Sequence, residues 1–183
     1  MSEAILKLQN VTMQFGGVVA LNDVTFEIKK QEILGLIGPN GAGKTTIFNV
    51  ITGVYQVTKG DITFEGKSIR GIKRYKITRG GVARTFQNIR LWGDMTALEN
   101  VITATDTHKR SGLISGLLGL PVSRREEKAD RQRAQELLDF IGIGEYADRL
   151  AKNLPYGVQR RLEIARALGT EPKLLLLDEP AAF

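Results

Sequence analysis

Apolar and polar residues alternate along two segments near the N-terminus of the chain. The segments are residues 4–15 and 21–28. Alternation with a period of two predicts strands that place one face on a core and the other in water. A third strand is predicted at residues 61–65, between two turns that contain glycine. Together these segments predict an N-terminal antiparallel β subdomain.

Two other segments are apolar without alternation. Residues 32–37 are mostly apolar, and residues 174–177 are four leucines. Short continuous apolar runs are typical of strands that are covered on both faces. The leucines lead directly into Asp178 and Glu179, so this strand would present two carboxylates at its C-terminal end, where open α/β sheets bind ligands. A further short strand is predicted from residue 80 to a polar segment at Gln87.

Helical patterns occupy much of the second half of the chain. Thr96 and Glu99 have the spacing of a capping box, which predicts that a helix begins there. Residues 126–140 are amphipathic and are followed by a glycine, and another helix is predicted up to residue 168. Residues 109–120 predict a loop rich in glycine and leucine, which either packs on its own helices or touches a membrane protein. These elements predict a helical insert between two parts of the core.

The phosphate-binding pattern G-x-x-x-x-G-K-[ST] is matched in full between a predicted strand and a predicted helix. The stretch consists of Gly38, Pro39, Asn40, Gly41, Ala42, Gly43, Lys44, Thr45 and Thr46. Its glycines allow backbone N–H groups and the helix N-terminus to converge on an anionic phosphate. Lys44 would add a positive charge at the β- and γ-phosphates, and the Thr45 hydroxyl would bind Mg²⁺. A plain glycine-rich turn would explain the glycines but not the Lys-Thr pair, so we predict a nucleotide site.

Side chains elsewhere in the sequence could complete such a site. Asp178 could hold Mg²⁺ through water, and Glu179 could activate the attacking water. Gln87 could move into and out of the water shell of the metal, although a surface amide is the commoner role for such a residue. Phe15 could present its ring to an adenine or could fill the core, and the sequence leaves both roles open.

Composition restricts the class of protein. With 183 residues, 42% of them hydrophobic and 25% charged, the chain has the composition of a globular protein with one core. No apolar run approaches the roughly 18 residues of a membrane span, and no secretory signal is visible, so we expect a cytosolic protein. The sequence has no cysteine, which excludes disulfides and thiolate metal sites. The net charge of +6 could suit nucleic acid, but bases and acids are mixed at residues 123–131, as on a solvated helix.

In this order the motifs resemble those of the ATP-binding subunits of ABC transporters. The resemblance covers essentially the whole chain and rests on four motifs: the phosphate loop at 38–46, the Gln loop at 84–87, the signature segment and its helix at 154–167, and the Walker B strand at 174–180. Within the family the chain resembles the importers of branched-chain amino acids. The sequences that favour this subgroup are Arg-Thr-Phe-Gln at 84–87, Met-Thr at 95–96, Glu-Asn-Val at 99–101 and Arg-Arg-Leu-Glu-Ile-Ala-Arg at 160–166.

The resemblance implies an α/β fold, a P-loop NTPase core with an N-terminal antiparallel β subdomain and a helical insert. Its segments would be residues 1–87 with the β subdomain and phosphate-loop core, 88–156 with the helical subdomain, and 157–183 with the signature helix and Walker B strand. It also implies an ATPase that powers amino-acid import, with ATP and Mg²⁺ as cofactors. The functional residues would be Glu179, Gln87 and Lys44 in catalysis, Thr45, Gln87 and Asp178 at the metal, and Phe15 at the adenine.

The resemblance also implies partners. In a head-to-tail dimer, with a second copy or with a related ATPase, ATP would lie between one subunit's phosphate loop and the other's signature segment. The signature segment comprises Leu154, Pro155, Tyr156, Gly157, Val158 and Gln159. A membrane permease would bind at the Gln loop and the helical insert, on the cytoplasmic face of the inner membrane. No nucleic-acid partner is expected.

The sequence departs from the family pattern in two respects. Pro155 stands where the family usually has Ser, and Val158 where it often has Gln; the loss of the Ser hydroxyl predicts a slower composite site. After Pro180 the sequence runs only to Phe183, so the family's C-terminal strands and switch histidine are missing, and His108 lies too early to replace that histidine. We expect two apolar strands without a neighbour, and therefore an isolated chain of low stability.

Two other functions compete with import. A nucleotide-binding fragment without turnover is the alternative that the short C-terminal end supports. A DNA-repair or chromosome ATPase is disfavoured, because such proteins carry long coiled coils or zinc modules, whereas this chain has a short helical insert and no cysteine.

Overall fold

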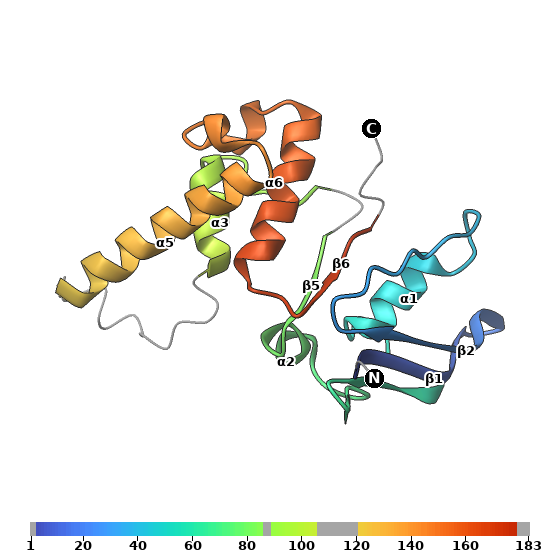
Figure 1. Cartoon of the computed structure of the whole chain (residues 1–183). Coiled ribbons are helices and arrows are strands. Elements are labelled where there is room, and N and C mark those ends of the chain that lie inside the picture. The colour runs from blue at the N-terminus through green and yellow to red at the C-terminus, as the bar shows by residue number, and fades with distance from the viewer. Residues whose placement is uncertain (1–2, 86–88, 106–120, 179–183) are drawn as a thin grey trace. The chain divides into compact units, whose positions relative to one another are not determined.

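The computed structural model describes residues 3–85, 89–105 and 121–178 (Figure 1). The chain forms two compact units, Met1–Gly80 and Gly81–Phe183. The division between them falls within the first of the three segments expected from the sequence.

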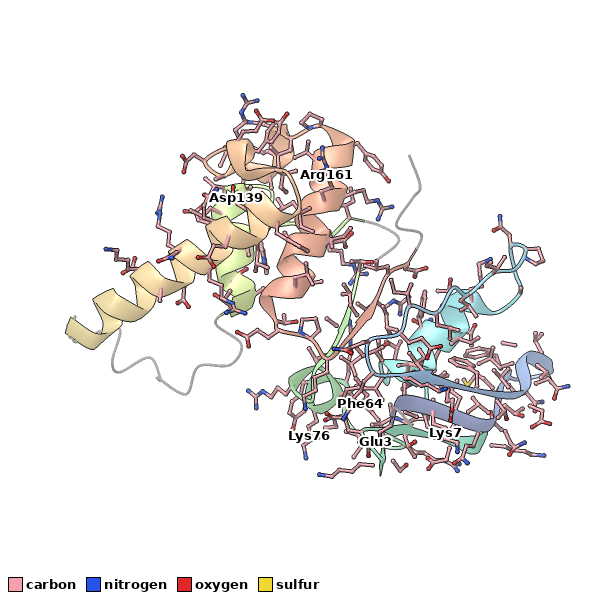
Figure 2. The ribbon with its side chains drawn as sticks, viewed as in Figure 1. Glu3, Lys7, Phe64, Lys76, Asp139 and Arg161 are labelled. Atoms are coloured by element: carbon pink, nitrogen blue, oxygen red, sulfur yellow. The ribbon has the colours of Figure 1, made fainter. Side chains whose placement is uncertain are left out.

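The first unit contains an antiparallel sheet with the strand order β2-β1-β3-β4. Its strands are β1 (Ala4–Phe15), β2 (Val18–Lys29), β3 (Lys59–Phe64) and β4 (Lys67–Ser68). The alternating pattern has the predicted result, because Leu6 and Leu8 of β1 are fully buried and lie opposite Phe64 and Ile62 of β3. Phe64 is labelled in Figure 2. β2 begins at Val18, earlier than the predicted residue 21.

Two helices complete the first unit. Helix α1 (Lys44–Ile51) contacts β2 and buries Ile47, Val50 and Ile51. Helix α2 (Arg74–Arg79) is a short helix that buries Ile77. The sequence predicted α1 from its apolar residues, and the helix begins within the phosphate loop, where the loop's lysine is its first residue.

The prediction of a strand at residues 32–37 is wrong. The structure assigns no strand there, and the side chains of Ile33 and Ile37 are 98% and 96% exposed. An apolar run forms a strand only where a neighbouring strand takes up its backbone hydrogen bonds and covers its side chains. Among the described residues, no strand pairs with this segment.

The second unit contains a pair of parallel strands, β5 (Val82–Arg84) and β6 (Leu174–Leu176). Val82 lies opposite Leu174, and Arg84 lies opposite Leu176. The ladder continues past β5, because the Thr85 N–H donates to the Leu176 carbonyl at 3.0 Å. Both strands were predicted, and their parallel pairing brings the ends of both strands to the same edge.

Three helices pack together beside this strand pair: α3 (Ala97–Thr105), α5 (Pro121–Phe140) and α6 (Tyr156–Gly169). They share a core that includes Ala97, Leu98, Val101, Ala134, Leu138, Ile143 and Leu162. Short 3-10 turns, η2 (Gly144–Tyr146) and η3 (Ala151–Asn153), connect α5 to α6. Arg161 of α6, labelled in Figure 2, donates to the Gly142 carbonyl just past the end of α5.

Local signals fix the start of α3 and the end of α5 as predicted, whereas α5 begins at Pro121, earlier than the predicted residue 126. The Glu99 N–H donates to the Thr96 hydroxyl, and the Thr96 N–H donates to the Glu99 carboxylate at 2.7 Å, which confirms the capping box. The backbone hydrogen bond from Thr96 is the main reason why the pKa of Glu99 lies below its ordinary value. Gly142 follows α5 with a φ of +74°, a conformation that favours glycine. The predicted loop at residues 109–120 lies outside the described residues.

In the described part of the chain, no helix is both long enough and apolar enough to cross a membrane.

Candidate functional site

The phosphate loop lies at the N-terminus of α1 in the first unit. Gly41 and Gly43 have φ values of +84° and +88°, in the left-handed region that glycine adopts without strain. Because the first N–H groups of a helix have no partner within it, the loop presents donors and the positive end of the helix dipole at one place. This arrangement has the features of the anion-binding site that the sequence predicts.

Lys44 turns its side chain back onto this loop. Its ammonium donates to the carbonyls of Gly38 and Pro39, the second bond measuring 2.9 Å. A positive charge is therefore held beside the backbone donors of the loop, and the two together suit an anion with several negative oxygens.

The phosphate loop packs closely against strand β2 at Gly43. A Cβ on Gly43 would lie 2.8 Å from the Ala20 carbonyl oxygen and 2.9 Å from Cδ2 of Leu21. Gly43 therefore meets two requirements at once, a left-handed backbone and a close approach to β2. Any larger residue would displace the loop from the strand on which it rests.

Phe15 lies at the end of β1 and is 40% exposed, so it does not fill the core. Its ring meets that of Tyr55 edge to face, with the centroids 5.0 Å apart and an interplanar angle of 78°. The contact with Tyr55 helps to orient the Phe15 ring, part of which remains exposed. Tyr55 was not identified from the sequence, because its place beside Phe15 depends on how the chain reverses after α1.

Asp178 lies in the second unit, just beyond β6, and is buried. Arg84 donates from Nη2 to Oδ2 of Asp178 at 2.8 Å, and the Asp178 N–H donates to the Thr85 hydroxyl at 3.1 Å. Sequence reasoning missed Arg84 as a partner of this carboxylate. The parallel register of the strands could have revealed it, had the pairing been known. Gln87 and Glu179 lie outside the described residues.

The described residues contain no group of three or more His, Cys, Asp or Glu side chains that could enclose a metal ion. Mg²⁺ usually binds proteins through one or two carboxylates and completes its shell with water and substrate phosphates. The exposed Thr45 hydroxyl and the Asp178 carboxylate are oxygen donors of the kind that Mg²⁺ takes. Each of the two groups, taken by itself within its own unit, is therefore chemically suited to that metal.

The signature segment at the start of α6 divides into exposed and buried residues. Pro155, Tyr156 and Gly157 are exposed, whereas Leu154 and Val158 belong to the helical core. Gln159 is half-buried and donates to the Leu154 carbonyl at 2.9 Å. The side chains of Leu154 and Val158 can therefore support the segment by packing, while the exposed residues remain available for contacts.

Arg160 connects the exposed start of α6 to its buried side. Its Nε donates to the Tyr156 hydroxyl at 3.1 Å, and its guanidinium lies over the Tyr156 ring. Its Nη1 lies 3.5 Å from the Glu163 carboxylate, with both side chains largely buried. Burial lowers the pKa of the nearby Arg166, and the negative charge of Glu163 opposes that shift. These contacts hold Tyr156 in one orientation.

The sequence matches known proteins over its whole length. The family model described as ABC transporter matches residues 21–182. The chain is 47% identical over 182 residues to the high-affinity branched-chain amino acid transport ATP-binding protein BraF of Pseudomonas aeruginosa. It is 48% identical over 182 residues to the corresponding protein LivG of Escherichia coli. In both cases the alignment covers 100% of this chain and 71% of the relative.

Solved structures agree with these matches. A nucleotide-free ATP-binding cassette from an ABC transporter superposes with a TM-score of 0.79 at 34% identity, covering 98% of this chain and 70% of the other. A dimeric ATP-binding cassette in a post-hydrolysis state, bound to ADP and Pi, superposes with a TM-score of 0.80 at 28% identity, covering 97% and 75%. These findings confirm the α/β P-loop fold and the resemblance seen in the motifs. The chain therefore belongs to the ATP-binding proteins of the ABC transporter family.

Proposed function

We propose that this chain binds ATP with Mg²⁺ at residues 38–46 and hydrolyses it to power an importer of branched-chain amino acids. The observation that carries the proposal is the complete phosphate loop, with Lys44 held against the loop's own carbonyls at the head of α1. The names of BraF and LivG support the choice of transported substrate. The comparisons do not favour the alternative, a fragment that binds nucleotide without turnover.

Each predicted residue has a role in this reaction. Lys44 binds phosphate oxygens, while Thr45, Asp178 and Gln87 hold Mg²⁺, with Asp178 acting through water. When bound by these residues, the metal would supply positive charge that neutralises the phosphates. Glu179 accepts a proton from the attacking water, and Phe15 stacks on the adenine. In phosphoryl transfer the protein contributes mainly position and electrostatic stabilisation, and these groups supply both within one subunit.

The signature segment acts on the ATP of a second subunit. Its exposed residues, Pro155, Tyr156 and Gly157, are free of the core and can meet a nucleotide from outside. A solved relative described as dimeric and bound to ADP and Pi supports a dimeric working state. The partner is a second copy or a related ATPase, and the dimer serves a transmembrane permease that binds at the Gln loop and the helical insert. The complex lies on the cytoplasmic face of the inner membrane.

ATP hydrolysis tests this proposal directly. We expect the purified full chain to release phosphate from ATP only when Mg²⁺ is present. Lys44→Ala should lower the rate by about a hundred-fold or more, since it removes a charge from the transition state. Lys67→Ala, which removes an exposed lysine of the same unit, is the matched control and should leave the rate unchanged. Absence of turnover in the folded chain, or equal rates for both variants, would contradict the proposal.

A further inference from the structure

A buried ion pair in the second unit has no role in the function described so far. Arg84 of β5 and Asp178 beyond β6 lie 2.8 Å apart, Nη2 to Oδ2, and their side chains are 9% and 6% exposed. Removing two charges from water is unfavourable, and a buried pair often contributes little net stability compared with apolar residues of similar size. The pair is therefore weak support for the fold, which suggests that it serves the carboxylate itself.

Hydrogen bonds to neighbouring residues hold the main chain at Asp178. The Thr85 N–H bonds to the Leu176 carbonyl, and the Asp178 N–H bonds to the Thr85 hydroxyl, which is itself buried. Two consecutive residues thus hold Asp178: the Arg84 side chain bonds to its carboxylate, and the Thr85 side chain accepts from its backbone N–H. The bond from Arg84 is thus made to a side chain whose main chain is itself held in place.

We propose that Arg84 is a positioning residue that holds the Asp178 carboxylate and thereby lowers the affinity of the nucleotide site for Mg²⁺. The inference depends on the proposed function, in which Asp178 is a metal residue. A guanidinium at Oδ2 neutralises much of the charge that attracts a cation, and it repels a second cation brought to the same carboxylate. The water through which Mg²⁺ binds Asp178 must therefore share this carboxylate with Arg84.

Arg84 should therefore stabilise the chain when no metal is bound and weaken the binding of the metal. A chain that lacks Arg84 keeps a buried carboxylate without its ion-pair partner, which is unfavourable until a cation arrives. Such a variant should be less stable in the absence of Mg²⁺, and it should gain more stability when Mg²⁺ and nucleotide are added. A residue with only a structural role would weaken the fold but would leave the Mg²⁺ dependence unchanged.

The test is a titration of Mg²⁺ into the full chain in the presence of a fluorescent ATP analogue, which measures binding rather than turnover. The Mg²⁺ concentration that gives half of the maximal signal should fall about tenfold in Arg84→Met, the change expected from losing one charge-assisted bond that competes with the metal. Arg131→Met is the matched control, because it removes the same charge from an exposed pair with Asp148. Its half-saturating Mg²⁺ should equal that of the wild type.

A second variant keeps the test decisive if Arg84→Met does not fold. Arg84→Lys retains the charge but loses the planar guanidinium, so its half-saturating Mg²⁺ should fall by about threefold. A value equal to or above that of the wild type, in whichever Arg84 variant folds, would overturn the proposal. If the folded wild type binds no analogue at any Mg²⁺ concentration, the proposed function itself is wrong and the inference falls with it.

Discussion

Residues 32–37 and residues 174–176 are both short apolar runs, yet only the second forms a strand. β6 pairs in parallel with β5, and Leu174 and Leu176 are buried. The isoleucines of residues 32–37 are almost fully exposed, and among the described residues no strand bonds to that segment. The difference shows that an apolar pattern specifies a strand only together with a partner that satisfies its backbone and covers its side chains.

The strongest test of this comparison is a matched pair of truncations. Leu176→Ala should lower the free energy of unfolding by about 2–5 kcal/mol, because it opens a cavity between packed groups. Ile37→Ala should change it by no more than about 0.5 kcal/mol, because the side chain is 96% exposed. Urea unfolding followed by circular dichroism measures both. A cost for Ile37→Ala as large as that for Leu176→Ala would mean that residues 32–37 are covered in solution, and the comparison would fail.

A smaller effect separates two glycines of the phosphate loop. Gly43→Ala should lower the free energy of unfolding by about 1–3 kcal/mol, because it adds a clash with β2 to the strain of a left-handed backbone. Gly41→Ala should cost less, about 1 kcal/mol, because the backbone is similar but no atom lies within 4 Å of its Cβ position. The same unfolding measurement compares them. Equal losses would show that the loop does not rest on β2.

The smallest effect concerns the cap of α3, where a local contact rather than a neighbouring strand fixes the element. The hydrogen bond from Thr96 lowers the pKa of Glu99 in the folded chain, so the ionised carboxylate favours folding. That contribution is complete above the unfolded-state pKa of about 4.3, and it is lost as pH falls below that value through the lower pKa of the folded state.

Glu99→Gln should therefore be less stable than the wild type at pH 7, and the difference should shrink towards pH 3. The measurement is the urea midpoint of each protein at the two pH values. Glu127→Gln, which changes an exposed glutamate of α5, is the control. A difference between Glu99→Gln and the wild type that persists unchanged at pH 3 would show that the carboxylate charge is not what supports the cap.

Features that depend on a few neighbouring residues could be predicted from the sequence. The phosphate loop at the head of α1, the capping box of Thr96 and Glu99, and the alternating strand β1 all follow from local spacing. Each of these signals involves residues that are close together in the sequence, so it can be recognised without knowing which distant segments pair.

Features that depend on which strands meet could not be predicted in the same way. The exposure of residues 32–37 depends on the lack of a pairing strand, which the segment's own pattern does not reveal. The pair of Arg84 and Asp178 depends on the parallel register of β5 and β6. The burial of Leu154 and Val158 likewise depends on how α6 packs, although the motif alone suggested that the whole signature segment faces a nucleotide.

The most direct test of the account is calorimetric titration of the folded chain with ATP in the presence of Mg²⁺, repeated with Lys44→Ala. The account predicts saturable binding of one ATP per phosphate loop to the wild type, and affinity lower by about tenfold or more in the variant, because a charge-assisted contact to phosphate is lost. Absence of binding to the folded wild type, or equal affinity in the two proteins, would contradict the claim that residues 38–46 hold the nucleotide.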